Sequence, residues 1–251
     1  MSTEASPDTT TDLNTQPTTT AAAAAKRRFR GGSIELSNLS PLEQLKAGRL
    51  PRRLVQLFIG LSLYGLAMAA FVRAGVGLDP WDVFHYGIAE RINLSLGTVV
   101  IIVGFLVLLL WIPLKQWPGL GTVANVVWIG VATDVGLHFI PAADHPLSQW
   151  GLFAVALVFN GLAGALYIGS QFGPGPRDGL MTGLHQRTGL SLRLVRTGIE
   201  LAVLGAGWLL GGIVGFGTLA YALLIGPFTQ FFMRWSIVQL DRPSLEPATK
   251  Q

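Results

Sequence analysis

The chain has 251 residues, of which half are apolar and only 13% are charged, and its mean hydropathy is +0.49. Several apolar runs approach the ~20 residues that cross a bilayer as a helix, so the composition excludes an ordinary soluble domain and predicts a polytopic membrane protein. The absence of cysteine excludes disulfides and thiolate metal sites. The formal net charge of +4 does not indicate nucleic-acid binding, because the basic residues cluster beside apolar segments, where they set membrane orientation.

The first part of the chain precedes the apolar segments. Residues 1–39 are rich in Thr, Ala and Pro and then in Lys and Arg, which predicts a disordered cytoplasmic tail. No apolar stretch follows a basic start, so a secretory signal is not expected. Ser40, Pro41 and Glu43 form a capping-box pattern, and residues 40–53 are therefore expected to form a short amphipathic helix at the membrane interface.

The apolar segments fall into two groups, residues 54–140 and 150–236, separated by a polar external loop at 141–149 and followed by a cytoplasmic tail at 237–251. Each group contains one helix of about 13 residues, which at about 20 Å is too short to cross the bilayer. The expected short helices are Pro80–Ile92 and Pro176–Thr188. The expected spans are Leu54–Val72, Gly97–Leu114, Gly119–Ile140, Trp150–Ile168, Leu192–Gly212 and Thr218–Trp235.

The two groups are copies of one another at a constant spacing of 96 residues. Gly65-Leu66-Ala67 recurs as Gly161-Leu162-Ala163, and Pro80 and Asp82 recur as Pro176 and Asp178. Because each copy has three crossings, the copies are expected to insert with opposite orientation. The predicted fold is an all-α polytopic membrane protein of two inverted repeats, each with three transmembrane helices and one short re-entrant or interfacial helix.

The distribution of basic residues supports this topology. With both termini cytoplasmic, sixteen of the eighteen Lys and Arg residues fall on the inner side, and only Arg73 and Arg91 fall outside. The segments before the two short helices contain Gly77 and Pro80 in the first repeat and Gly173, Pro174, Gly175 and Pro176 in the second. Non-helical backbone at membrane depth is tolerated where protein or water covers it, so these turns are expected to line an interior interface or cavity.

Asp82 and Asp178 are matched acids near the starts of the short helices. At the third helical position each carboxylate can accept hydrogen bonds from free N–H groups and complement the helix dipole. The alternative is that the two acids form a cation or proton site, and the two roles are compatible. Arg177 stands where the first repeat has Trp81, and it can either bind an anion beside a helix N-terminus or pair with Asp178.

Asp134 and Glu200 are the acids placed deepest in apolar sequence. An intramembrane carboxylate is costly and is a functional candidate with a partner, so a proton-relay role is one interpretation of either residue. The other interpretation of Glu200 is a local pair with Arg196 at a spacing of four, whereas Asp134 has only His138 at that spacing, which could titrate with it.

The last span of each repeat opens with a Gly-x-Gly-Thr turn, in which threonine can cap the helix. These turns contain Gly121 and Thr122 in the first repeat and Gly217 and Thr218 in the second. The sequence lacks a phosphate-binding Gly-x-x-x-x-Gly-Lys-Ser/Thr stretch and the common hydrolase motifs, so no enzyme activity, cofactor or metal is expected.

The paired motifs resemble the YczE/YitT-type family of bacterial integral membrane proteins over roughly residues 50–240. The most distinctive stretch is Gly-Pro-Gly-Pro-Arg-Asp-Gly-Leu-Met, which begins at Gly173 and is followed by Val195, Arg196 and Glu200. The soluble C-terminal domain of the YitT type is missing, so the YczE branch fits better. The resemblance implies a multi-pass protein of the bacterial plasma membrane more than it implies an activity.

We therefore expect a secondary transporter or permeation protein for a small polar or charged solute, handled between the two short helices. The alternative is a non-transporting scaffold or regulator of an envelope process. An intramembrane enzyme is a weaker third option, because no nucleophile–base pair emerges. The expected partners are the lipid bilayer and an unknown small solute, with no nucleic acid, and a homo-oligomer is left open.

Overall fold

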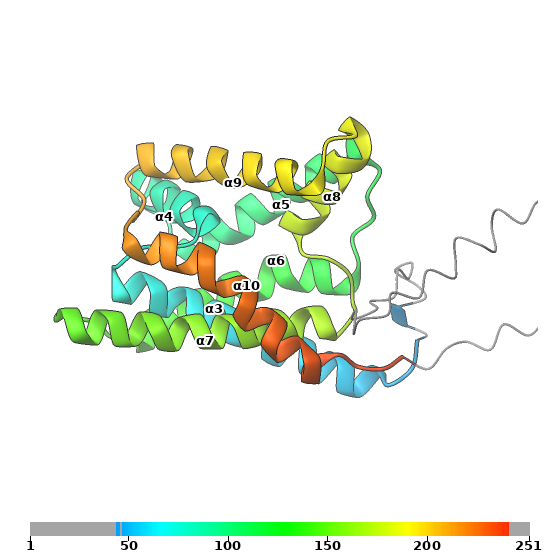
Figure 1. The fold of residues 1–251 in the computed structure, drawn as a ribbon, viewed down its shortest axis with the longest axis horizontal. Helices are drawn as coiled ribbons and strands as arrows, with labels where there is room; N and C mark the ends of the chain where they lie inside the picture. The colour runs from blue at the N-terminus through cyan, green and yellow to red at the C-terminus, as the bar shows by residue number, and fades with distance from the viewer. Residues whose placement is uncertain (1–43, 46, 241–251) are drawn as a thin grey trace, which may run out of the picture. The chain divides into compact units, whose positions relative to one another are not determined.

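The computed structural model describes residues 44–45 and 47–240, which belong to one compact unit of the chain. This part of the chain contains eight helices of at least 13 residues (Figure 1). Their bounds are α3 (Leu50–Ala74), α4 (Pro80–Ile92), α5 (Leu96–Leu114), α6 (Leu120–Phe139), α7 (Pro146–Gly169), α8 (Pro176–Thr188), α9 (Leu192–Leu209) and α10 (Phe216–Ser236).

Five of these helices, α3, α5, α6, α7 and α10, are long and apolar enough to cross a membrane. The prediction of an all-helical protein with several helices long and apolar enough to cross a membrane is therefore confirmed for the described residues. The remaining long helix, α9, has 18 residues and carries three charged side chains, those of Arg193, Arg196 and Glu200, and it is not among the five.

The helices form two matched sets of four. Each helix from α7 to α10 begins 96 residues after its counterpart from α3 to α6, and the bounds of α4 and α8 are those predicted. The first long helix begins at Leu50, earlier than the predicted Leu54, because Pro51 occupies the first turn, where proline costs no hydrogen bond. The predicted capping box at 40–43 lies outside the described residues.

Arg53, which the sequence analysis assigned to an interfacial helix, is instead a buried residue of α3. Its guanidinium donates hydrogen bonds of 2.9 Å to the carbonyls of Ser170 and Gln171 and stacks over the ring of Phe172 at 4.2 Å. The buried charge is tolerated because the carbonyls at the end of α7, which have no partners within the helix, accept hydrogen bonds from the guanidinium. Arg53 therefore joins the first helix to the segment that leads into α8.

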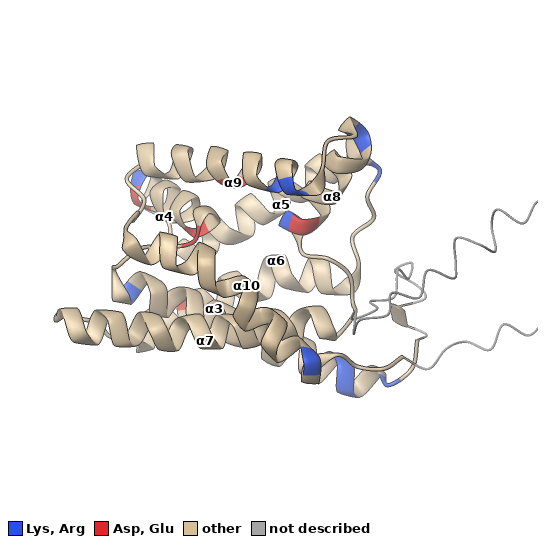
Figure 2. Ribbon diagram, in the orientation of Figure 1, with Lys and Arg blue, Asp and Glu red and all other residues tan. Residues whose placement is uncertain are grey.

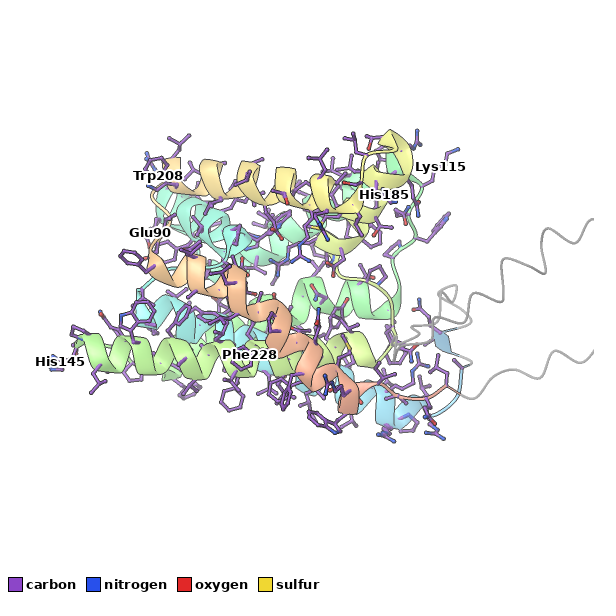
Figure 3. The ribbon with its side chains drawn as sticks, viewed as in Figure 1. Glu90, Lys115, His145, His185, Trp208 and Phe228 are labelled. Atoms are coloured by element: carbon purple, nitrogen blue, oxygen red, sulfur yellow. The ribbon has the colours of Figure 1, made fainter. Side chains whose placement is uncertain are left out.

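The matched helices run in opposite directions. Figure 1 shows α3 and α7 side by side and antiparallel, and these two helices have the most extensive contact of any pair. Figure 3 places Lys115 and His185 at one end of the helices and Glu90, His145 and Trp208 at the other. The short helices α4 and α8 therefore end at opposite ends of the long helices.

The irregular segments before α4 and α8 are held by the last helix of the opposite set. The carbonyl of Val76 accepts a 2.9 Å hydrogen bond from Gly217 N–H, and the carbonyl of Phe172 accepts one of 2.9 Å from Gly121 N–H. Gly77 has φ +137°, and a Cβ there would lie 2.6 Å from the backbone nitrogen of Thr218. These exchanges satisfy backbone groups that lipid could not.

The threonines of the Gly-x-Gly-Thr turns lie in the first turns of α6 and α10. Thr122 Oγ1 accepts from Gly119 N–H at 3.1 Å and donates to the carbonyl of Pro174 at 2.7 Å. Thr218 Oγ1 accepts from Gly215 N–H at 3.3 Å. Each threonine thus caps its helix, and Thr122 also fixes the Gly-Pro-Gly-Pro turn that precedes α8.

The two sets differ where the third helix meets the fourth. In the first set α5 packs closely on α6, since a Cβ on Gly97 would lie 2.1 Å from the Gly130 carbonyl and one on Gly104 would lie 2.9 Å from Val126. The residues of α9 at the positions of Gly97 and Gly104 are Arg193 and Glu200, and these long side chains prevent such an approach. No close packing joins α9 to α10, and a Cβ on Gly226 of α10 would have no neighbour within 4 Å.

Candidate functional site

A cavity of about 330 Å³ lies where the first turns of α4 and α8 meet, and it extends into the space between α9 and α10. Its walls come from both sets of helices and combine aromatic, amide and charged side chains. The charged residues that line it are Asp79, Arg177, Asp178, Arg196 and Glu200. Figure 2 shows acidic and basic positions together at the start of α8 and an acidic one at the start of α4. The cavity is at the small end of the range for ligand pockets.

Arg177 lies at the centre of the wall formed by the short helices. Its Nη2 donates to the hydroxyl of Tyr64 at 2.6 Å, and its Nη1 lies 3.5 Å from Asp79 Oδ2. The guanidinium also lies 5.8 Å from the centre of the Trp81 ring. Its side chain is 30% exposed, whereas that of Asp79 is 4% exposed. Arg177 therefore links the two short helices and keeps donors available to the cavity.

Asp79, which the sequence analysis did not select, caps α4. Its Oδ1 accepts from the backbone N–H groups of Trp81 and Asp82, both at 2.8 Å. Asp79 at the N-cap position thus accepts from the N–H groups that the sequence assigned to Asp82, while Asp82 stands in the first turn of α4, as expected. Asp82 is buried behind the main cavity, where its Oδ1 lies 3.6 Å from His85 Nδ1 beside a second space of about 40 Å³.

Asp178 and Glu200 both line the main cavity. Asp178 stands in the first turn of α8, next to Arg177. Glu200 accepts a 2.8 Å hydrogen bond from Arg196 on the same face of α9, which confirms the predicted local pair. Asp178 and Asp82 do not face a common space, so the structure does not bring these two acids together in one site.

Asp134 lies outside the cavity and holds the start of α5. Its two carboxylate oxygens accept from Gly97 N–H at 2.7 Å and from the Ser95 hydroxyl at 2.6 Å. The partner expected from the sequence was His138, but the close approach of α6 to α5 offers a free helix N-terminus instead. This carboxylate therefore caps α5 and joins it to α6.

The sequence analysis missed the tyrosines of the cavity. Tyr64 and Asn125 of the first set correspond, at the spacing of 96, to Asn160 and Tyr221 of the second, and all four line the cavity. Tyr221 donates to Asn160 Oδ1 at 3.0 Å. A search for identical residues overlooks this exchange of Tyr and Asn. A search for positions 96 residues apart that are both polar, whether or not the residues are identical, would have identified these two pairs.

Within the described residues, no group of three or more His, Cys, Asp or Glu side chains is placed to hold a metal ion. The cavity instead offers hydrogen-bond donors and acceptors of both charges, enclosed by aromatic rings. Such a set can hold and orient a small solute, since the donors and acceptors on the two sides of the cavity can discriminate between its groups.

Comparisons with known proteins identify relatives of the whole membrane part. Residues 51–234 match the model of a family of unknown function, DUF6198. The chain is 36% identical to an uncharacterised protein of Haemophilus influenzae over 70% of this chain and 81% of that protein. It is 33% identical to the uncharacterised membrane protein YczE of Bacillus subtilis over 73% of this chain and 86% of that protein. No solved structure matches the chain.

Proposed function

The chain belongs to the DUF6198 family and is similar to the membrane protein YczE, and we propose from its geometry that it is a secondary transporter or permeation protein for a small polar or charged solute. The observation that carries this proposal is the cavity of about 330 Å³ at the meeting point of two short helices. Broken or short helices at matching positions of two repeats form the binding sites of many secondary transporters.

We further propose that the two sets of helices are inverted repeats, with α9 as the sixth crossing. The matched helix starts, the antiparallel course of α3 and α7 and the opposite ends reached by α4 and α8 all support this arrangement. The charges of α9 are compatible with a crossing, because Arg196 and Glu200 line the cavity and neutralise each other.

The proposed orientation places both termini in the cytoplasm of a bacterial cell. Figure 2 shows that Lys and Arg positions gather at the end of the helices where α3 begins and α8 and α10 end. Positive residues favour the cytoplasmic face of the plasma membrane, so this end would face inward. The short helix α8 would then enter from the cytoplasm, and α4 would enter from outside.

The difference between the two sets supports alternating access. The first set is closed by the packing of α5 on α6, whereas the second set leaves α9 and α10 apart with the cavity between them. In a transporter built from inverted repeats, exchange of these two arrangements would move the opening from one side of the membrane to the other.

The proposal is tested by reconstituting the purified full chain in proteoliposomes and measuring gradient-driven movement of a panel of labelled small solutes. Wild-type protein should move at least one of them. Arg177→Gln removes the central charge of the cavity and should lower the flux by about tenfold or more, because charge-assisted hydrogen bonds of this kind are worth about 1.5–3 kcal/mol. The control is Arg193→Gln, which removes an arginine of α9 that does not line the cavity and should leave the flux unchanged.

An absence of gradient-driven flux from wild-type liposomes would contradict the proposal. So would equal flux from the wild type and Arg177→Gln. If the protein is instead a scaffold, loss of the central cavity charge should not matter in cells. Cells that carry Arg177→Gln should then have the wild-type phenotype as long as the variant protein reaches the membrane.

A further inference from the structure

The starts of the two short helices differ in one respect that concerns ligand binding. At α4 the carboxylate of Asp79 accepts from two successive backbone N–H groups, those of Trp81 and Asp82. The matched position at α8 is Gly175, which has no side chain to accept from the N–H groups of Arg177 and Asp178. The carboxylate of Asp178 accepts instead from Gly175 N–H. The first turn of a helix presents N–H groups that need an acceptor, and its dipole favours a negative one.

The uncapped end of α8 faces the main cavity. Gly175, Pro176, Arg177 and Asp178 all line it, so the N–H groups of Arg177 and Asp178 are next to the space a ligand would occupy. The side chain of Arg177 adds further donors, since among the described residues its guanidinium hydrogen-bonds to Tyr64 and pairs with Asp79 through two of its nitrogens. This is the set of donors that a carboxylate meets when it binds at a helix N-terminus beside an arginine.

A second, independent observation points to a ligand. Trp81 lines the same cavity and is only 5% exposed, yet its indole Nε1 has no hydrogen-bond partner among the described residues. A buried donor without an acceptor is costly, and indole can only donate. The missing acceptor is therefore expected from a molecule that enters the cavity.

The charges in the cavity limit which anion fits. Three acids, Asp79, Asp178 and Glu200, line it against two arginines, Arg177 and Arg196. A dianion such as phosphate would meet more repulsion than a single carboxylate. The planar carboxylate also has two oxygens, as Asp79 has at α4, and can accept from adjacent donors. The tyrosines, Ile168 and Met181 provide apolar surface for an organic group.

We propose that the cavity binds a small organic monocarboxylate, whose carboxylate caps α8 in the place that Asp79 occupies at α4 and accepts from Arg177 and Trp81. This inference names the substrate class of the cavity and rests on the proposed transport function. It concerns binding, so that it can be tested in the absence of transport.

The matched position provides a sharp test. Gly175 has φ −65° and ψ 162°, a conformation open to any residue, and a Cβ there would have its nearest neighbour, Asp178 Oδ2, at 3.4 Å. Gly175→Asp gives α8 the capping carboxylate that Asp79 provides at α4. The new residue would lie three positions before Asp178, and the matched pair Asp79 and Asp82 shows that two acids three positions apart are tolerated at such a helix start. Gly175→Ala is the matched control, which adds the Cβ without the carboxylate.

Binding is measured on the purified full chain in detergent by calorimetry and by the shift in unfolding temperature. The probes are acetate, propionate, lactate, pyruvate and benzoate, each compared with its amide, and phosphate and succinate serve as dianions. At least one monocarboxylate should stabilise the wild type more than its amide does. Gly175→Asp should raise the unfolding temperature without a probe and weaken carboxylate binding by about tenfold or more, whereas Gly175→Ala should bind as the wild type does.

Trp81→Phe keeps the aromatic ring, removes the N–H and should weaken binding severalfold, which provides a second variant should Gly175→Asp fail to fold. Wild-type protein that prefers no monocarboxylate over its amide would overturn the inference, as would undiminished binding to Gly175→Asp or to Trp81→Phe. Carboxylate binding without flux in proteoliposomes would contradict the transport proposal alone. Flux of another solute without carboxylate binding would contradict this inference alone.

Discussion

Asp79 serves two purposes that can be separated by substitution. It caps α4 through two hydrogen bonds of 2.8 Å, and its other oxygen lies 3.5 Å from the Arg177 guanidinium. Asp79→Asn keeps a good N-cap and removes the charge, whereas Asp79→Ala removes both. The two variants should therefore differ in stability by the energy of the cap.

The expected losses in the free energy of unfolding follow from the contacts of Asp79. Loss of an N-cap costs about 1 kcal/mol. The ion pair is half-buried, because Asp79 is 4% exposed and Arg177 is 30% exposed, and we assign it about 1 kcal/mol, at the upper end of the range for exposed pairs. Asp79→Asn should thus lower the free energy of unfolding by about 1 kcal/mol and Asp79→Ala by about 2 kcal/mol.

The assay is unfolding by SDS in mixed micelles, followed by circular dichroism. Asp144→Ala, an exposed acid in the loop between α6 and α7, is the control and should change stability by less than about 0.5 kcal/mol. Equal destabilisation by Asp79→Asn and Asp79→Ala would show that the cap contributes nothing. Wild-type stability of both variants would refute the reasoning on the site as a whole.

Three further predictions concern packing, capping and topology. Gly65→Val should destabilise the protein by about 3 kcal/mol or more in the same assay, because a Cβ there would lie 2.6 Å from the Ala132 side chain, whereas Gly151→Ala, with no neighbour within 4 Å, should be neutral. Asp134→Ala removes two hydrogen bonds at the start of α5 and should cost about 2 kcal/mol while leaving carboxylate binding intact, so weakened binding would place Asp134 in the site. In this cysteine-free chain, Thr188→Cys and Ala142→Cys should react with impermeant reagents from opposite faces of the membrane, and reaction of both from one face would exclude the inverted arrangement.

Much of the helical layout could be predicted from local sequence. The two short helices were expected at their observed bounds, because proline opens each of them and the duplication repeats every boundary. The start of α3 lies earlier than the predicted Leu54, because a buried arginine at position 53 is not expected from local sequence. The sequence does not reveal that carbonyls at the end of α7 accept from Arg53 inside the fold.

The candidate site was less accessible from the sequence. Asp178, Arg177 and Glu200 were found because charge is rare and costly in apolar segments. Asp134 satisfied the same criterion but caps α5, since its partners lie 37 and 39 residues away in the chain. Asp79 was overlooked beside Asp82, and only the direction of the Asp79 side chain shows that one oxygen caps α4 while the other faces Arg177.

The sequence alone determined the membrane class, the duplication and the positions of the short helices, because hydropathy, proline and a constant spacing are properties of the chain itself. The fold was needed to show that α5 packs on α6 while α9 stands apart from α10, and that the starts of α4 and α8 meet at one cavity. The reason is that both results depend on contacts between segments far apart in the chain. Arg193 and Glu200, for example, prevent close packing of α9 on α10, which becomes evident only once the two helices are placed in the fold.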